Sequence, residues 1–475
     1  MELKKNYLAL AIVSAALVGC GGDDNKSNGS DPVAKSFVSC EGDVCTLTGT
    51  IDEDYTLTAD KTWLLDGLVK VGRGNVGITA ADVAGLKADG AILTVEPGTH
   101  VQGLDDGVLI VTRGSKIMAE GTAANPITFS SAADENFDGL GEWGGVIIQG
   151  FAPQYGAGNT GACYGEGTVC NVQGEGGVAV GFYGGNEPAD NSGVLKYVRI
   201  AEAGKVAGPN NEVNGLTLMG VGHGTSIEYI QVHNNLDDGI EWFGGTVNVK
   251  YAVLTGNDDD DIDFDTGWKG NVQYAIVRKD ATKANPSGTN DPRGIEANSS
   301  DAEFVPQTEG ALANITLIGG PVSNVGGEPA MRLRGAVNVR LYNSVAMNWG
   351  TCARIDSAVT GTEAGTVPSD VSFTNVVGSC TNFYRTGSTT TEAGTVGNQS
   401  LTMTDAVALT SSSVTVSAWE PADNGSGFAF DNTNYAGAVA PGTTAANAWW
   451  AGWIIPGSLD GVATQANPAV AVAAE

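Results

Sequence analysis

The chain has 475 residues, and its 54 acidic and 24 basic side chains give a formal net charge of −30. A negative charge of this size argues against nucleic acid or an anionic lipid surface as a partner. The length is ample for a large core. The 68 glycines, among many Val, Ile, Thr and Asn residues, favour short strands and tight turns over helices.

Residues 1–19 predict a signal peptide for export. Two lysines make the start of the chain positive, and the apolar run at 7–18 is too short to span a bilayer. The run ends in LVGC at 17–20, which resembles the lipobox of bacterial lipoproteins. That resemblance implies cleavage before Cys20 and attachment of lipid to its thiol. An ordinary signal peptide or an anchor helix is the alternative.

Residues 20–36 predict a flexible tether behind the lipidated cysteine. The stretch is rich in Gly, Asp, Asn and Ser, and it has too few apolar residues to form a core. In lipoproteins of Gram-negative bacteria, an Asp directly after the cysteine usually retains the protein at the inner membrane. Here that position is Gly21, so the resemblance implies the outer membrane, with the lipid anchor on Cys20 as the membrane contact.

Residues 37–150 predict an N-terminal cap and the first coils of a β structure. The turn sequence EPGT at 96–99 follows the first of several short apolar runs. These runs have the composition of strands and lie at 92–95, 108–111, 127–129 and 146–148.

Residues 151–420 contain a repeat with a period of about 22 residues, which is typical of solenoids. DGIEW at 238–242 recurs one period later as DDIDF at 260–264, and after a longer interval as RGIEA at 293–297. Each segment reads as a short strand that points an apolar residue inward and its polar neighbours outward. Similar segments occur at 214–218 and 329–333.

A second strand follows most of these segments. Its tyrosines, Tyr229, Tyr251 and Tyr274, recur at nearly the same interval as the first strand. This spacing predicts an all-β fold, a right-handed parallel β-helix with about 22 residues per coil and strands about 4.8 Å apart. The longer intervals would hold loop insertions rich in Asp, Asn, Gly and Pro, of which residues 279–293 are one. A β-sandwich or a propeller is the alternative, but propeller repeats run to about 40 residues and sandwich strands lack a stacked register.

Residues 421–475 predict a C-terminal cap and tail. Four tryptophans lie in or near this stretch, and we expect them to cover the open end of the β-helix; binding of sugar is the alternative. They are Trp419, Trp449, Trp450 and Trp453.

The seven cysteines support export. Lipidation of Cys20 would leave six, which fall into three pairs that are close in sequence. Disulfides within these pairs, one of fifteen possible connectivities, are what an oxidising compartment favours. The pairs are Cys40 with Cys45, Cys163 with Cys170, and Cys352 with Cys380.

Five motifs together resemble a family of bacterial surface lipoproteins with pectate-lyase-like β-helices. They are EPGT at 96–99, WGG at 143–145, LKYVR at 195–199, DGIEWFGG at 238–245 and AGW at 451–453. The resemblance covers most of residues 45–455. It implies the fold and the location, but no established activity and no catalytic residues.

Stacking the coils places side chains in columns on the outer surface of the predicted β-helix. Carboxylates one coil apart would lie about 4.8 Å from each other, where unscreened like charges repel and something must compensate. The first column reads Thr217, Glu241, Asp263, Glu296 and Arg332. The second reads Met219, Phe243, Asp265, Asn298 and Arg334, and the third Asn214, Asp238, Asp260, Arg293 and Pro329.

Calcium is the first candidate for that compensation, because it takes six to eight oxygens from carboxylates and carbonyls. The predicted ligands are Asp238, Asp260, Asp261, Asp263 and Asp265. Compensation by the arginines of these columns is the second candidate, and a substrate is the third. A solvated acidic surface without a ligand is the remaining alternative.

A catalytic interpretation of the same columns rests on Glu241, Asp263 and Glu296. Carboxylates one coil apart fall near the separation of retaining glycosidases, and those two coils apart lie at the outer edge of the inverting range. The chain lacks a recognisable lyase base or a strong acid–base signature. The leading hypothesis is therefore a non-enzymatic surface module that binds a glycan or a surface protein. A polysaccharide lyase or hydrolase is the alternative, and an accessory part of an uptake system is a third possibility.

Overall fold

A computed structural model describes the chain from the predicted cap onward, and Phe37–Glu475 forms one compact unit. The predicted signal peptide (1–19), Cys20, most of the tether and the pair Cys163 and Cys170 lie outside the described residues. Those residues are 35–133, 135–155, 169, 171–176, 179–208, 211–299, 306–323, 328–356, 370–385, 399–402, 416, 418–421, 424–440, 443–460, 462 and 471–472.

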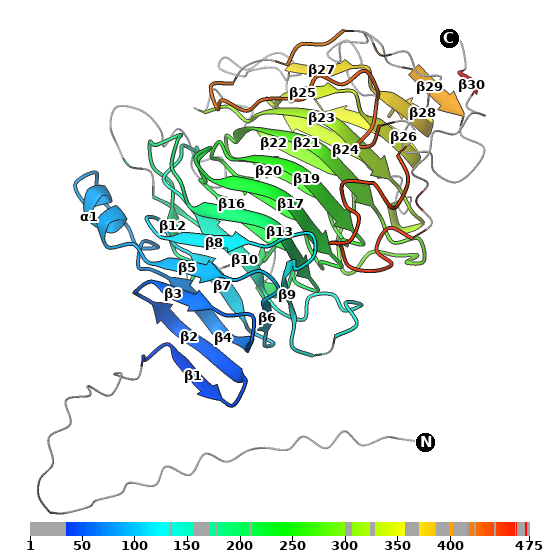
Figure 1. Cartoon of the computed structure of the whole chain (residues 1–475). Coiled ribbons are helices and arrows are strands. Elements are labelled where there is room, and N and C mark those ends of the chain that lie inside the picture. The colour runs from blue at the N-terminus through cyan, green and yellow to red at the C-terminus, as the bar shows by residue number, and fades with distance from the viewer. Residues whose placement is uncertain are drawn as a thin grey trace, which may run out of the picture. The chain divides into compact units, whose positions relative to one another are not determined.

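The prediction of a right-handed parallel β-helix is confirmed. Three parallel sheets run along the stack of coils, and each coil contributes a strand or half a strand to each sheet. Figure 1 shows the strands of successive coils side by side from β4 to β27. None of the described residues belongs to a helix with the length and apolar character that crossing a bilayer requires.

The first sheet contains one strand from each coil, all parallel. Its members are β3 (Tyr55–Leu57), β5 (Ile92–Val95), β8 (Lys116–Glu120), β13 (Gly193–Ala201), β17 (Ser226–His233), β19 (Asn248–Thr255), β21 (Lys269–Arg278), β23 (Glu309–Ile318), β25 (Asn338–Tyr342) and β27 (Asp370–Thr374).

The second sheet begins with β2 (Val44–Ile51), β4 (Thr62–Val71), β6 (His100–Gly103) and β9 (Ile127–Ser131). It continues through the second halves of β13, β17, β19, β21 and β23, because these strands bend at a corner and enter both sheets. It ends with β26 (Val345–Asp356), β28 (Val377–Tyr384) and β29 (Gln399–Thr402).

The third sheet carries the strands that the repeat predicted. It consists of the second half of β4, then β7 (Val108–Val111), β10 (Gly145–Gln149), β16 (Leu216–Met219), β18 (Ile240–Phe243), β20 (Ile262–Asp265), β22 (Ile295–Ser299), β24 (Pro329–Gly335) and the second halves of β26 and β28.

The remaining elements lie around this stack. The first strand, β1 (Val38–Glu41), pairs antiparallel with β2 at the N-terminal end, and β30 (Ala471–Val472) pairs antiparallel with β29. Two short antiparallel pairs are β11 (Val172–Gln173) with β12 (Phe182–Tyr183), and β14 (Val206–Gly208) with β15 (Asn211–Glu212). The helix α1 spans Val83–Ala88.

The core is built by side chains that repeat from coil to coil. In the third sheet, Ile240 pairs directly with Ile262, which in turn pairs with Ile295, and each exposes at most 2% of its surface. Burying an apolar side chain of this size contributes about 1.5–3 kcal/mol. Because inward residues alternate with outward ones, this inward column fixes which side chains of each strand face out.

Four stacked tyrosines mark the corner between the first and second sheets. Tyr197, Tyr229, Tyr251 and Tyr274 all adopt positive φ, and their ring centroids are 4.4, 4.5 and 5.0 Å apart along the stack. The left-handed conformation costs a non-glycine residue about 1–2 kcal/mol, and stacking of aromatic pairs offsets part of that cost.

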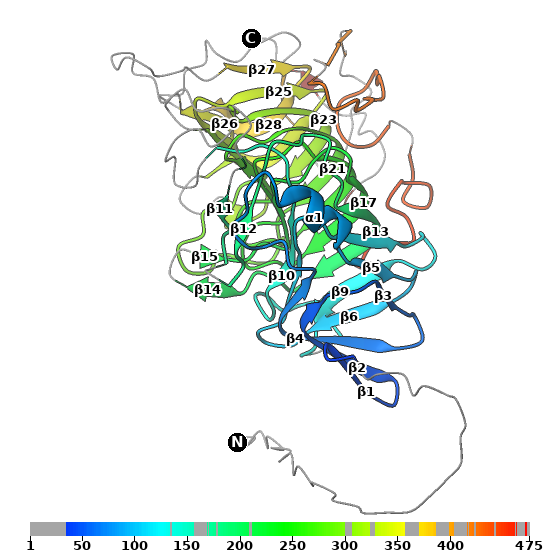
Figure 2. The same ribbon diagram turned by 90° about the vertical axis from the view of Figure 1, so that its left-hand side faces the viewer.

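A C-terminal strap, formed by residues 424–440 and 443–458, lies along the flank of the β-helix. Trp453 and Trp449 pack against the tyrosine stack, and Gln273 hydrogen-bonds both the backbone N–H and the carbonyl of Asp431. In Figure 2 this segment, coloured orange to red, lies on the opposite side of the stack from β11, β12, β14 and β15. These tryptophans therefore cover a side of the β-helix, whereas the sequence led us to expect them at its end.

Two of the predicted disulfides are confirmed. Cys40–Cys45 joins β1 to β2 within the N-terminal hairpin, and Cys352–Cys380 joins β26 to β28. The described part of the chain thus contains disulfides at both ends of the stack of coils.

Candidate functional site

The predicted carboxylate column exists in the predicted register. Glu241 pairs with Asp263 and Asp263 with Glu296 on neighbouring strands of the third sheet. Thr217 precedes them in the column and Arg332 follows. Periodicity alone therefore sufficed to align the site, because the buried isoleucines fix the register.

The outer face of the third sheet changes along this column from apolar to acidic and then to basic side chains. On the N-terminal side, Ile110 and Ile147 belong to an apolar cluster that β11 and β12 complete with Val172 and Tyr183. The carboxylates follow, and Arg332 and Arg354 end the column on the C-terminal side.

The carboxylates of this region are buried or half-buried, Asp263 being half-buried, so they do not form a freely solvated acidic surface. Asp238, Glu241 and Glu296 expose 6%, 8% and 5% of their surface. Tyr155, from the segment after β10, covers part of this face and donates a hydrogen bond of 2.5 Å to Asp265. Ionised groups this deep in a protein require partners or shift their pKa toward the neutral form.

The third predicted column lies in the turns before the strands and is held by hydrogen bonds between coils. Asp238 Oδ1 accepts a hydrogen bond of 2.9 Å from the backbone N–H of Asp260. Asp260 Oδ1 accepts one of 2.6 Å from the backbone N–H of Arg293. Each carboxylate thus caps the next coil, which explains why the turns stack so closely.

An inner cluster consists of Asp238, Glu241 and Asp263. One carboxylate oxygen from each lies within 4.8 Å of the others. Glu241 accepts a hydrogen bond of 2.5 Å from the side-chain amide of Asn214. Asp263 Oδ1 and Asn214 Oδ1 are buried and accept no hydrogen bond from the described residues.

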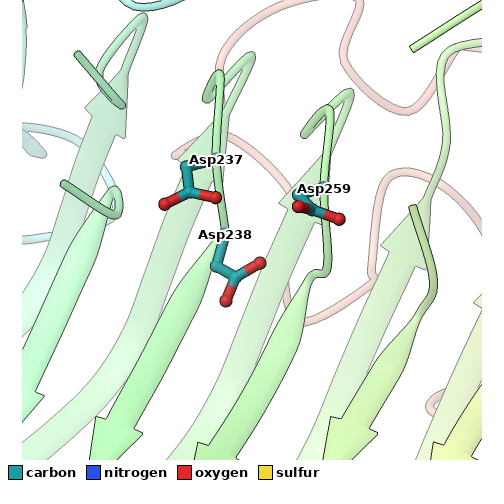
Figure 3. A group of neighbouring side chains, drawn as sticks. All are labelled: Asp237, Asp238 and Asp259. Atoms are coloured by element: carbon teal, nitrogen blue, oxygen red, sulfur yellow. The ribbon is translucent and has the colours of Figure 1, made fainter. Parts of the chain in front are cut away.

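An outer cluster shares Asp238 with the inner one and adds Asp237 and Asp259, again with oxygens within 4.8 Å of one another. Figure 3 shows Asp237 and Asp238 on one turn and Asp259 beside them on the turn of the next coil. The two clusters together gather five carboxylates, with Asp238 shared between them.

Burial and mutual repulsion hold protons on these acids. Burial raises the pKa of Asp238 well above its ordinary value, and the charges of Asp237, Asp263 and Glu241 raise it further. Burial likewise raises the pKa of Glu241 and of Asp263. Among these groups Asp263 has a basic side chain near it, Arg334, which only partly offsets the repulsion.

The C-terminal part of the column has basic partners. Arg293 is fully buried and ion-pairs with Glu296 and, at 3.2 Å, with Asp260. Arg334 Nε lies 2.6 Å from the other oxygen of Glu296. The positive charge is therefore concentrated around Glu296 and Asp260, and little of it is left to balance the inner cluster when its carboxyl groups ionise.

The chain matches a family model described as a pectate-lyase like beta helix domain over residues 49–454. It belongs to that family. No curated protein and no solved structure matches the chain.

Within this pectate-lyase-like β-helix, the five predicted metal ligands do not form one site. Asp238 and Asp263 lie in the inner cluster. Asp260 is paired with Arg293. Asp261 is fully buried and binds Lys279 at 2.7 Å, and Asp265 accepts hydrogen bonds from Tyr155 and from the backbone of Thr266. The last three are therefore occupied by protein partners.

Two members of the outer cluster were not among the predicted ligands. Asp237 and Asp259 are adjacent to predicted ligands, and the run of aspartates at 258–261 was the available signal for Asp259. Glu241 was considered only for catalysis, although it shares a strand face with Asp263. Lys279 carried no signal, since it lies in a predicted loop insertion and is nevertheless fully buried against Asp261.

Proposed function

We propose that the chain is a non-enzymatic binding module that is stabilised by calcium and presents its β-helix on a bacterial outer membrane. The signal-like residues 1–19 and Cys20 support export and lipid anchoring. The fold supports a rigid surface for a glycan or a surface protein, and repeat proteins commonly bind partners on such extended surfaces. Fractionation of cells tests the anchor: the wild type should be found with the membranes, and Cys20→Ser should be released from them. Wild-type protein in the soluble fraction would contradict the anchor.

The observation that carries the calcium proposal is the inner cluster. Asp238, Glu241 and Asp263 converge, and among the described residues none of the three forms an ion pair with a basic side chain. Arg334 lies near Asp263 but pairs with Glu296, as Arg293 does. Calcium accepts carboxylate and amide oxygens in flexible arrangements. Asp263 Oδ1 and Asn214 Oδ1, which accept no hydrogen bond from the described residues, are oxygens of the kinds that calcium takes as ligands.

The burial of the column favours a structural role over catalysis. Glu296 has both carboxylate oxygens in ion pairs, with Arg293 and Arg334. A carboxylate held in this way is poorly suited to give up or accept a proton, and it lies beneath the outer surface of the sheet. A cation in the inner cluster would instead join the turns of neighbouring coils.

We expect calcium to raise the melting temperature of chelator-treated protein. At a free concentration about 100 times the dissociation constant, binding to the folded state adds about 2.7 kcal/mol. For a chain of this length, that corresponds to a rise in Tm of about 3 °C. Differential scanning calorimetry at pH 8, with and without calcium, measures the rise.

Two variants make this test specific. Asp263→Asn removes one ligand charge and should abolish most of the rise in Tm. Asp66→Asn changes an exposed aspartate of β4 and should keep the full rise. Equal shifts in both variants, or no shift in the wild type, would contradict the calcium proposal.

A polysaccharide lyase or glycoside hydrolase is the second candidate. One observation favours it: Glu241 and Asp263 are direct cross-strand neighbours, and the pKa of each is raised. A carboxyl group that stays protonated near neutral pH can act as a general acid. Reducing-end and ultraviolet assays on acidic and neutral glycans test this candidate, and an activity that Glu241→Gln abolishes would replace the binding proposal.

A further inference from the structure

A second site lies on the edge of the β-helix where the C-terminal strap meets the ends of second-sheet strands. A cavity of about 270 Å³ opens there between the ends of β17, β19 and β21 and the turn 455–458 of the strap. Its lining includes His233, Thr255, Arg278 and Asp280. None of these residues belongs to the inner or outer cluster.

His233 presents a hydrogen-bond acceptor to this cavity. Its Nδ1 lies 3.1 Å from the carbonyl oxygen of Thr255 and 2.7 Å from the hydroxyl of the same residue. In the tautomer that carries its proton on Nδ1, the ring donates to Thr255, and Nε2 keeps a lone pair that can accept a hydrogen bond. Burial lowers the pKa of His233 to about 4, which keeps the ring neutral at physiological pH.

The strap forms a fixed wall on the other side of the cavity. The backbone N–H of Ile455 donates a hydrogen bond of 2.7 Å to Gln231, whose side-chain amide donates to the hydroxyl of Ser458 at 3.0 Å. Arg278 Nη1 donates to the carbonyl oxygen of Ser458 at 2.9 Å. The wall is thus built before any ligand arrives, which lowers the entropic cost of binding.

The polar groups of the lining suit hydroxyl groups. Arg278 brings the donors of its guanidinium group, and His233 Nε2 brings an acceptor. Asp280 uses Oδ1 for the backbone N–H and hydroxyl of Thr282, which leaves Oδ2 as a further acceptor. Lys279 also lines the cavity, but its ammonium group is fully buried in an ion pair with Asp261. Arg278 and Asp280 therefore give the cavity one positive and one negative side chain that a ligand can reach. One carboxylate supplies too few ligands for a metal ion, and its negative charge disfavours binding of an anion.

The volume of the cavity and the apolar part of its lining further restrict the class of ligand that it can bind. Ile455 and Pro456 of the strap supply apolar surface against which the C–H groups of a ring could pack. The volume is at the small end of ligand cavities. We infer that this cavity binds a single neutral pyranose ring, such as a terminal or branching residue of a glycan.

The inference is tested with methyl glycosides of glucose, galactose and mannose on the full exported protein. Saturation-transfer NMR and calorimetry should detect at least one of them with a Kd on the order of 1 mM, as expected for so small a ligand. His233→Phe keeps the ring volume but removes the acceptor, and should weaken binding at least tenfold. Arg278→Gln, on a different strand, should do the same.

The matched control is His100→Phe, which changes another partly buried histidine, on β6, whose ring nitrogen contacts Ser130. Binding should persist in this control and in the presence of a calcium chelator, so the result is separate from the calcium proposal. Failure of all three glycosides to bind would overturn the inference. Tenfold preference for methyl glucuronoside, or unchanged binding in both His233→Phe and Arg278→Gln, would overturn it as well.

Discussion

Protein without bound metal is expected to become less stable as the pH rises from about 4 to about 7. Several buried acids in and beside the two clusters have a higher pKa in the folded state than in the unfolded state, so they keep their protons to a higher pH while the chain is folded. Burial raises the pKa of Asp259 to about 7 and, despite the nearby Lys279, that of Asp261 to about 6. Burial is also the main reason why the pKa values of Asp238 and Asp263 are raised well above their ordinary values.

The sign of the effect follows from proton linkage. A carboxyl group whose pKa is higher in the folded state binds more protons there than in the unfolded state. Its favourable contribution is fully present below the unfolded pKa, near 4, and is lost as the pH passes through the folded value. Each unit of difference corresponds to 1.36 kcal/mol, so several such groups together give a change on the order of 5 kcal/mol.

Calcium should reverse this loss, because it binds the deprotonated carboxylates and takes the place of their protons. We therefore expect Tm to fall by about 5 °C between pH 4.5 and pH 8 in chelator, and to fall much less in calcium. Calorimetry across this range measures both curves. A double variant, Asp238→Asn with Asp263→Asn, should show a flatter curve in chelator and no calcium effect. A chelator curve that rises toward pH 8 would contradict the buried-acid account.

The fold and the register of the site could be predicted because both depend on periodicity. The regular spacing of the repeat aligns Glu241 with Asp263, and the inward isoleucines decide which face those side chains occupy. The loop insertion before β22 lengthens one interval but leaves the register intact, since Asp263 still pairs with Glu296.

The burial of the site could not be predicted, because it depends on segments outside the repeat. Tyr155 reaches Asp265 from a distant part of the sequence, and Lys279 reaches Asp261 from a predicted loop. The tyrosine corner was equally hidden. Its residues adopt positive φ, which sequence propensity assigns to Gly, Asn or Asp, and only stacking along the coils makes tyrosine acceptable there.

Arg293→Met is expected to be the most destabilising single substitution in the site. The guanidinium is fully buried and ion-pairs with Asp260 at 3.2 Å and with Glu328 at 3.0 Å, and it also contacts Asp291 and Glu296. Although burial opposes its ionisation, the charges of these carboxylates raise the pKa of Arg293. Its removal leaves buried carboxylates without a partner, which costs about 3–5 kcal/mol.

The matched control is Arg340→Met, because Arg340 pairs with Asp370 at the surface, where that carboxylate is 64% exposed. A surface pair of this kind contributes at most about 1 kcal/mol. Denaturant unfolding gives the two free energies. Hydrogen exchange at the amides of β20 and β22 localises the effect, since coils of a solenoid open locally.

The cause of the loss can be separated from loss of packing. If uncompensated charge is responsible, adding Glu296→Gln to Arg293→Met should recover part of the stability, and the cost of Arg293→Met should shrink toward pH 4.5, where the carboxylates take up protons. A cost that stays constant with pH and is not relieved by Glu296→Gln would show that Arg293 acts mainly by filling space. That result would contradict the interpretation that charge balance stabilises the column, at Arg293, the residue with the most ion-pair partners there.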